Sequence, residues 1–292
     1  MSMSKKYFGI LYMILSAFCF ALMNVFVRLS GDIPTIQKSF FRNLTALIFA
    51  FFILRKNHIP AGWKKGNLKY FLIRSAAGTM GILCNFYAVD HLVLSDASML
   101  NKMSPFFAIL FSLIFLKEKI SLFQISAVAA AFFGCIFIIK PSFINMELIP
   151  AIVGFLGGIS AGGAYTAVRY LGSKGEKGPF IVFFFSAFSC IVTLPYLILN
   201  YHNMTLNQFA FLMLAGLSAA GGQFSITAAY CHAPAKEISI YDYSQIIFSA
   251  VLGFVIFYQT PDKWSILGYI IIIASAVLMF IYNNQKEKVK KC

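Results

Sequence analysis

Charged residues are scarce in this chain, and acidic ones are the scarcest. Only 12% of the 292 residues are charged, 60% are hydrophobic, and the mean hydropathy is +0.79. Soluble domains carry roughly a quarter charged residues, so this composition excludes a water-soluble domain and predicts an integral membrane protein. The formal net charge of +14 then indicates basic loops facing an anionic lipid surface rather than nucleic-acid binding.

Several chemical signatures are missing as well. The six cysteines form no C-x-x-C pair, and the four histidines are too scattered to predict a metal site. No Walker sequence or glycine-rich phosphate loop is present. No clustered nucleophile, base or metal ligands near one interface point to a membrane enzyme. We therefore expect no cofactor, no bound metal and no enzymatic activity.

Ten apolar runs are long enough to be membrane-spanning helices. The connections on the side of Lys5 and Lys6 are rich in lysine and arginine, whereas the opposite connections hold mostly acidic residues. The positive-inside rule then predicts a cell-membrane protein with both termini in the cytoplasm. The predicted spans are 8–29, 36–54, 68–90, 95–116, 120–139, 149–171, 179–199, 207–232, 237–258 and 264–282.

The chain also repeats itself at a single shift of 141 residues (169 − 28 = 141). The matching pairs are Ala21 with Gly162, Asn24 with Tyr165, Arg28 with Arg169, Asn101 with Asp242, Ser104 with Gln245, Ala108 with Ser249 and Ser112 with Gly253. Each half holds five spans, an odd number, so the second half must enter the membrane inverted, as in many transporters. We expect one five-helix repeat over 1–142, a second over 149–283 and a basic cytoplasmic tail over 284–292.

Short stretches along the whole chain carry a family resemblance. They are Phe41-Arg42-Asn43, Ser104-Pro105-Phe106, Leu116-Lys117-Glu118, the segment from Gly134 to Pro141, and Ala233-Pro234-Ala235. On these residues the chain resembles the drug/metabolite transporter superfamily, specifically its EamA-type members with ten spans. The resemblance implies an all-α membrane protein of two inverted five-helix repeats that carries small metabolites. The second half departs from the pattern at Ile246, where a proline is expected, and at Gln259, where a glutamate is expected.

The ninth span places a carboxylate inside an apolar helix. Asp242, Gln245, Ser249 and Gly253 share one helical face. Since a buried carboxylate costs about 2.5–3.5 kcal/mol on insertion scales, Asp242 should face protein or water. As the only well-buried acid, Asp242 is the candidate for proton coupling. A structural ion pair with Arg74, which lies at a similar depth, is the alternative.

Three cations also lie inside predicted spans, at Arg42, Arg74 and Lys102. If they face the interior, the buried charge balance is positive and favours a substrate with a carboxylate or electron-rich carbonyls. If they snorkel to the nearer interface, they are only anchors. Small-residue faces on the third and eighth spans surround Asn85 and Gln223, and tight helix packing is the alternative to a cavity there.

Tyrosines beside the polar positions combine a ring with a hydroxyl and suit a flat or aromatic solute. The predicted substrate-binding residues are Asn24, Arg42, Arg74, Asn85, Asn101, Tyr165, Gln223, Tyr241, Tyr243 and Gln245, with Asp242 as the proton-coupling candidate.

The sequence therefore predicts a secondary or facilitative transporter that works by alternating access around a central cavity. The expected substrate is an amino acid or related carboxylate, or a flat heteroaromatic such as a riboflavin-type vitamin or an adenosyl metabolite. Expected partners are this substrate, the lipid bilayer and possible protons or a counter-solute, with a monomer or homodimer as the assembly. The direction of transport stays open, and a multi-span membrane enzyme or a channel is the alternative.

Overall fold

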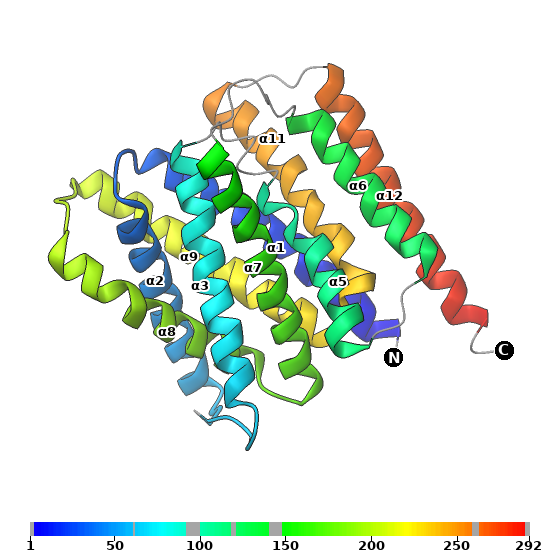
Figure 1. The fold of residues 1–292 in the computed structure, drawn as a ribbon, viewed down its shortest axis with the longest axis horizontal. Helices are drawn as coiled ribbons and strands as arrows, with labels where there is room; N and C mark the ends of the chain where they lie inside the picture. Colours follow the sequence, from blue (N-terminus) through cyan, green and yellow to red (C-terminus); the bar gives the residue numbers. More distant parts are fainter. Residues whose placement is uncertain are drawn as a thin grey trace.

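The structure is a computed structural model that describes residues 3–60, 62–91, 100–117, 121–139, 148–258 and 263–289. Ten helices of at least 13 residues fill most of these ranges, which contain no strand (Figure 1). They are α1 (Met3–Leu29), α2 (Thr35–Lys56), α3 (Leu68–His91), α5 (Ser104–Leu116), α6 (Leu122–Ile139), α7 (Leu148–Ser173), α8 (Gly178–Leu199), α9 (Leu206–His232), α11 (Ser244–Phe257) and α12 (Lys263–Val289). Six described helical segments are long and apolar enough to cross a membrane on their own.

Eight of the ten predicted spans coincide with single helices, and the fourth and ninth do not. The ninth was predicted as one helix over 237–258, but it consists of a short helix α10 (Ala235–Ile238), a 3-10 segment η1 (Ser239–Tyr243) and then α11. In the fourth, residues 102–103 form a turn before α5 begins, and residues 95–99 lie outside the described residues. Both spans are therefore discontinuous near the same repeat position.

Proline explains only one of the two breaks. Pro105 lies in the first turn of α5 and has no N–H with which to continue a helix from the preceding turn. Its counterpart Ile246 has an N–H, yet the chain is still broken there. In η1 the N–H of Ser244 bonds the carbonyls of Asp242 and Tyr241, and the Ser244 hydroxyl bonds the Tyr241 carbonyl at 2.6 Å. This local hydrogen bond of the Ser244 side chain to the backbone competes with α-helix in this half.

The ends of α5 and α11 reproduce the repeat at atomic detail. Lys117 and Tyr258 terminate these helices in the left-handed conformation, with φ of 53° and 55° (258 − 117 = 141). Their N–H groups bond the carbonyls of Ser112 and Gly253, which are separated by the same shift (253 − 112 = 141). Glu118 and Gln259, the next pair, lie outside the described residues, as does Pro141.

The ends of α3 and α9 match in the same way. Each helix ends in a histidine, His91 and His232 (232 − 91 = 141). Each ring Nδ1 lies within hydrogen-bond distance of the carbonyl four residues earlier, at 2.9 Å from Tyr87 and 2.7 Å from Ala228. The same shift thus relates the ends of two helix pairs in the two halves.

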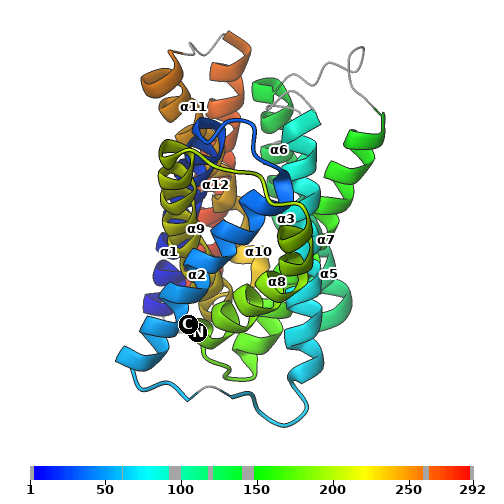
Figure 2. The same cartoon turned by 90° about the vertical axis from the view of Figure 1, so that its left-hand side faces the viewer.

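Contacts between the halves follow a pseudo-twofold pattern. Helix α1 packs along α9, and its counterpart α7 packs along α3, which is the counterpart of α9. Likewise α11 contacts α1 and α5 contacts α7, while α2 packs on its own counterpart α8 and α6 on α12. The α6–α12 pair stands at one side of the bundle, and the first turn of α1 and the last turn of α12 lie at the same end (Figures 1 and 2).

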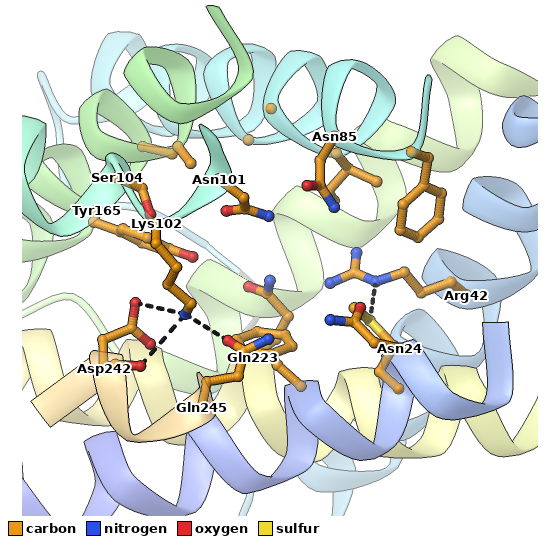
Figure 3. Close-up of a pocket in the computed structure, with 18 of the residues that line it drawn as sticks. Asn24, Arg42, Asn85, Asn101, Lys102, Ser104, Tyr165, Gln223, Asp242 and Gln245 are labelled. Carbon is orange, nitrogen blue, oxygen red and sulfur yellow. Dashed lines mark hydrogen bonds and ion pairs between the residues drawn. The ribbon is translucent and has the colours of Figure 1, made fainter. Parts of the chain in front are cut away.

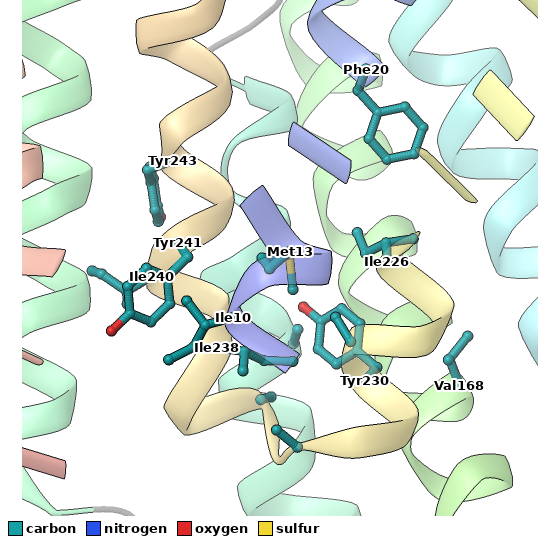
Figure 4. Packing of buried hydrophobic residues seen from close by; sticks show 14 of the residues in the cluster. Ile10, Met13, Phe20, Val168, Ile226, Tyr230, Ile238, Ile240, Tyr241 and Tyr243 are labelled. Atoms are coloured by element: carbon teal, nitrogen blue, oxygen red, sulfur yellow. The ribbon is translucent and has the colours of Figure 1, made fainter. Parts of the chain in front are cut away.

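The core lies where η1 and α10 meet α1 and α9. Met13 and Ile10 of α1 pack against Tyr230 and Ile238 in this cluster (Figure 4). Many large apolar side chains, such as Phe115, point outward and are exposed. An outer surface of this kind fits hydrocarbon rather than water.

A carboxylate ties two connections together at one end of the bundle. Oε1 of Glu176, between α7 and α8, accepts the Lys64 backbone N–H at 2.9 Å and Asn67 Nδ2 at 2.6 Å. The Lys64 ammonium in turn donates to the Lys174 carbonyl at 2.8 Å. These bonds clamp the α2–α3 connection to the α7–α8 connection.

Candidate functional site

A central cavity of about 80 Å³ lies between the two halves (Figure 3). Helices α1, α2, α3, α7, α8 and α9 line it together with the two broken spans. The polar residues at its wall are Asn24, Arg42, Arg74, Asn85, Asn101, Lys102, Ser104, Tyr165, Gln223, Asp242 and Gln245. They come from both repeats, so the cavity forms only when the halves are packed together.

Arg74 on α3 is the most deeply buried of the cavity cations, with 1% of its surface exposed. Its Nη2 donates to Gln223 Oε1 at 2.9 Å, and its Cζ lies 4.1 Å from the ring centroid of Phe185. Gly78, one turn further along α3, leaves the space that the guanidinium occupies, because a Cβ there would collide with Arg74 Nη1. Glycine thus lets the charge fold back against its own helix and face the cavity.

Arg42 on α2 is 3% exposed and is held by weaker acceptors. Its Nε approaches Met23 Sδ at 3.2 Å, and its Nη1 donates to Asn43 Oδ1 at 3.1 Å. Asn43 is itself fixed because its Nδ2 donates to Ser189 Oγ on α8 at 2.9 Å. A thioether is a poor hydrogen-bond acceptor, so the guanidinium keeps much of its donor capacity.

Neither guanidinium has a carboxylate partner among the described residues. Among the same described residues, Nε of Arg74 also has no hydrogen-bond partner. The side-chain amides of Asn24, Asn85 and Asn101 also make no hydrogen bond to another described residue, although they line the cavity. A buried charge is costly unless it is paired, so the cavity has an unmet capacity to bind an anion.

Lys102 and Asp242 form an ion pair at the opposite end of the cavity from Arg42 in the view of Figure 3. The Lys102 Nζ lies 3.3 Å from Asp242 Oδ2, 3.4 Å from the Asp242 carbonyl and 2.6 Å from Gln245 Oε1. Their side chains are 7% and 6% exposed. The pair joins the break before α5 to the break before α11, and it therefore bridges the two repeats.

Nine of the eleven residues predicted from the sequence line the cavity, and two do not. The Tyr241 hydroxyl approaches the Ala276 carbonyl on α12 at 3.5 Å, and the ring lines a separate apolar crevice beside α12. Tyr243 is fully buried in the hydrophobic core. Both tyrosines flank Asp242 in η1, and of these three residues only Asp242 lines the cavity.

Two further expectations are corrected by the geometry. The predicted alternative of an Arg74–Asp242 pair does not form, because Gln223 holds Arg74 and Lys102 holds Asp242. Lys102 was absent from the predicted binding residues, and snorkelling was an equal expectation, but it is 6% exposed at the cavity. Its signal in the sequence is its place beside Asn101, the repeat counterpart of Asp242. Ser249, predicted on the polar face, is exposed.

Two five-helix repeats around a polar cavity in an apolar shell define a membrane carrier of small molecules. The chain belongs to the EamA-like transporter family, whose pattern matches it twice, over residues 7–140 and 148–281. It is a multi-pass membrane protein with two repeats, as the resemblance implies. The two matches begin and end 141 residues apart (148 − 7 = 141), which is the shift seen in the helix ends.

Known relatives are similar over nearly the whole chain. The pseudopaline exporter CntI of Pseudomonas aeruginosa is 30% identical over 93% of this chain and 95% of its own length. An uncharacterized transporter of Helicobacter pylori is 27% identical over 96% and 97%. Solute carrier family 35 member G1 of Homo sapiens is 26% identical over 92% of this chain and 78% of its own. A solved crystal structure with 10% identity matches the fold with a TM-score of 0.83 over 96% of this chain and 98% of its own.

Proposed function

We propose that this protein is a secondary transporter for a small metabolite that carries a carboxylate. The observation that carries the proposal is the pair of buried guanidinium groups, Arg42 and Arg74, which face the cavity without a carboxylate among the described residues. Guanidinium groups bind carboxylates through two parallel hydrogen bonds, and they do so most strongly where water is excluded. The amides of Asn24 and Asn85 stand beside them to bind further polar atoms of the same substrate.

A flat heteroaromatic substrate has less support. Tyr165 is the only one of the three predicted tyrosines at the cavity, and its ring stacks on Tyr230 at 5.2 Å between centroids. Arg74 covers one face of Phe185. One face each of Tyr165 and Phe185 is thus taken, and Phe20 and Phe86 are the other aromatic residues at the cavity.

We propose alternating access as the mechanism. A cavity of about 80 Å³ is smaller than the roughly 300–1,000 Å³ of typical ligand sites, so the centre has to widen before a metabolite fits. Opening requires the repeats to rock against each other, and the breaks before α5 and α11 are natural points of bending. The Glu176 clamp joins the α2–α3 and α7–α8 connections at one end and would have to separate when that end opens.

We propose export as the direction and the cell membrane as the location. The name of the pseudopaline exporter supports export, since that relative is similar over almost all of both chains. Basic residues cluster in the connections that share a side with the termini, which supports cytoplasmic termini. Proton coupling through Asp242 belongs to the same proposal, because it is the buried carboxylate at the cavity.

A thermal-shift screen of the purified protein against a metabolite library tests the substrate class, because ligands that bind the native state raise its melting temperature. We expect carboxylates to be enriched among the hits, and their amide or ester analogues to lose the shift. Each hit is then tested for counterflow into liposomes that contain the protein. Hits confined to neutral heteroaromatic compounds would contradict the proposal.

A further inference from the structure

The cavity has two cationic ends, and they differ in how they are satisfied. At one end lies Arg42, close enough to Arg74 for their charges to interact, and neither has a carboxylate partner among the described residues. At the other end, Lys102 is already paired with the chain's own carboxylate, Asp242 (Figure 3). Gln223 lies between the two ends and holds Arg74.

The geometry of the Lys102 pair is that of an exchangeable contact. Its distance to Asp242 Oδ2 is 3.3 Å, longer than the roughly 2.7–2.9 Å of a strong charged hydrogen bond, while its shortest contact, 2.6 Å, is to the neutral oxygen of Gln245. Both Lys102 and Asp242 line the cavity, so a ligand there can reach the ammonium without entering the core. Gln245 would stay bonded to Lys102 during such an exchange.

We infer that Lys102 is a second carboxylate-binding position and that Asp242 occupies it when the carrier is empty. The preferred substrate then has two carboxylates, one bound at Arg42 and Arg74 and the other at Lys102. The second substrate carboxylate takes the ammonium from Asp242, and the displaced aspartate takes one proton from a hydronium ion of the solution, because an unpaired buried carboxylate is strongly disfavoured. One O–H bond forms on Asp242, one O–H bond of the hydronium ion breaks, and no other bond changes. This inference rests on the proposed function and specifies its substrate class.

In the described part of the chain, Lys102 is the cation that forms an ion pair with Asp242. Of the titratable groups near Asp242, Tyr165 on α7 and Tyr230 on α9 interact with its charge, and both are phenols that stay neutral near pH 7. Glu237 on α10 acts on Tyr241 instead. A proton is therefore the available replacement.

The charge balance agrees with export. A substrate with two carboxylates that moves together with one proton carries a net charge of −1 (−2 + 1 = −1). A membrane potential that is negative inside drives such a net anion outward. The proton thus reduces the charge that crosses the membrane without reversing its direction.

The test measures binding of α,ω-dicarboxylates, from malonate to suberate, and of their monomethyl esters as matched controls, by thermal shift. In the wild type we expect at least one diacid to bind about tenfold or more tightly than its monoester. Its affinity should weaken by up to about tenfold per pH unit as the pH rises from about 6 to 8, because one proton is taken up with it. If the Lys102–Asp242 pair were merely structural, the wild type would bind the diacid and its monoester about equally, and its affinity would not show this pH slope.

Two variants separate the parts of the inference. Asp242→Asn keeps Lys102 and removes its competitor, so the diacid preference should remain and its pH dependence should vanish. Asp242→Asn combined with Lys102→Met removes both charges and leaves no lone buried ion, so the diacid preference should fall to the monoester level. If either variant does not fold, the wild-type ratio and slope still decide.

The failures are distinguishable. A diacid-to-monoester ratio near one in the wild type, or a ratio unchanged in the double variant, would overturn the assignment of Lys102. A pH-independent affinity in the wild type would overturn the linkage to Asp242. In each case monoester binding that depends on Arg74 would leave the proposed function standing, whereas no binding of any carboxylate would overturn both.

Discussion

The two repeats have similar backbone structures but contribute opposite charges to the cavity. The three cavity cations, Arg42, Arg74 and Lys102, all belong to the first repeat, whereas Asp242 belongs to the second. The residues found 141 positions after the cations are Phe183, Ala215 and Tyr243, and the residue 141 positions before Asp242 is Asn101. The helix ends, the breaks and the contacts between helices obey the repeat, but the charged side chains do not.

This difference separates what the repeat supplies from what the site needs. Equivalent backbones allow the two halves to exchange roles during alternating access. A substrate, however, is not symmetric. The first repeat can hold its anionic groups, while the second supplies the carboxylate that takes the place of a substrate carboxylate when no substrate is bound. The four predictions below test this division.

The largest expected effect is an all-or-none difference in the side of the membrane from which two introduced cysteines react. Lys65→Cys and Asn203→Cys, each in a background without native cysteines, should react with an impermeant reagent from opposite sides only. Both residues are exposed in connections at equivalent ends of α2 and α8, which an inverted repeat places on opposite faces. Asn67 is less suitable, because it is buried against Glu176. Reaction of both cysteines from one side would contradict the inversion.

Breaking the pair that bridges the repeats should have the next largest effect. Lys102→Met alone leaves the Asp242 carboxylate unpaired at a buried site, and Asp242→Asn alone leaves the Lys102 ammonium unpaired there. Each variant should lower the free energy of unfolding by about 3–5 kcal/mol. The double variant should recover most of that loss. Thermal unfolding in detergent measures both, with Lys69→Met on an exposed turn of α3 as the control. Additive losses in the double variant would show that the two residues do not act as a pair.

Arg74→Ala gives the first repeat the residue that the second repeat has at the equivalent position, Ala215. It removes the guanidinium bonded to Gln223, so the affinity for a carboxylate found in the screen should fall by about 2–5 kcal/mol, which is roughly 30-fold or more. Binding measured by thermal shift gives the change. Lys69→Ala removes an exposed cation from the same helix and should leave the affinity unchanged. Equal losses in the two variants would indicate a general charge effect.

The smallest expected effect concerns packing. Gly162 on α7 lies where α5 approaches so closely that a Cβ would come within 2.5 Å of Phe107 Cβ and 3.0 Å of the Ala108 nitrogen. Its counterpart on α1 is Ala21, which is buried without such a conflict. Gly162→Ala should therefore lower the free energy of unfolding by about 1–3 kcal/mol. Ala21→Gly should cost about 1–2 kcal/mol, through backbone entropy and the loss of one buried methyl group. A Gly162→Ala variant as stable as the wild type would contradict a close α5–α7 approach.

Much of the fold follows from local signals in the sequence. The length of each apolar run predicts eight of the helices, since a bilayer requires both the length and the apolar surface. Charged, amide and tyrosine side chains in those runs predict nine of the eleven polar residues at the cavity, because polar groups avoid lipid and gather inside. These are properties of single residues and their neighbours along the chain.

The breaks in the fourth and ninth spans could not be predicted in this way. Pro105 is a local signal for one of them, but Ile246 continues an apolar pattern that is compatible with an unbroken helix. The 3-10 geometry of η1 depends on packing against α1, α5, α6 and α12, and it is this packing that directs Tyr241 and Tyr243 away from the cavity.

The sequence by itself determined a membrane protein of ten helices in two repeats and predicted their inversion, because apolar length and a constant shift are readable without contacts. Only the tertiary structure decided which charge pairs with which. Arg74, Asp242 and Lys102 all lie in apolar runs, and their depths permit more than one pairing. Because α3 and α9 both pack against α7 and α8, Arg74 comes within reach of Gln223, and bringing the two breaks together places Lys102 beside Asp242. Partner choice among buried ions depends on distances of a few ångströms across helices, which spacing along one chain does not encode.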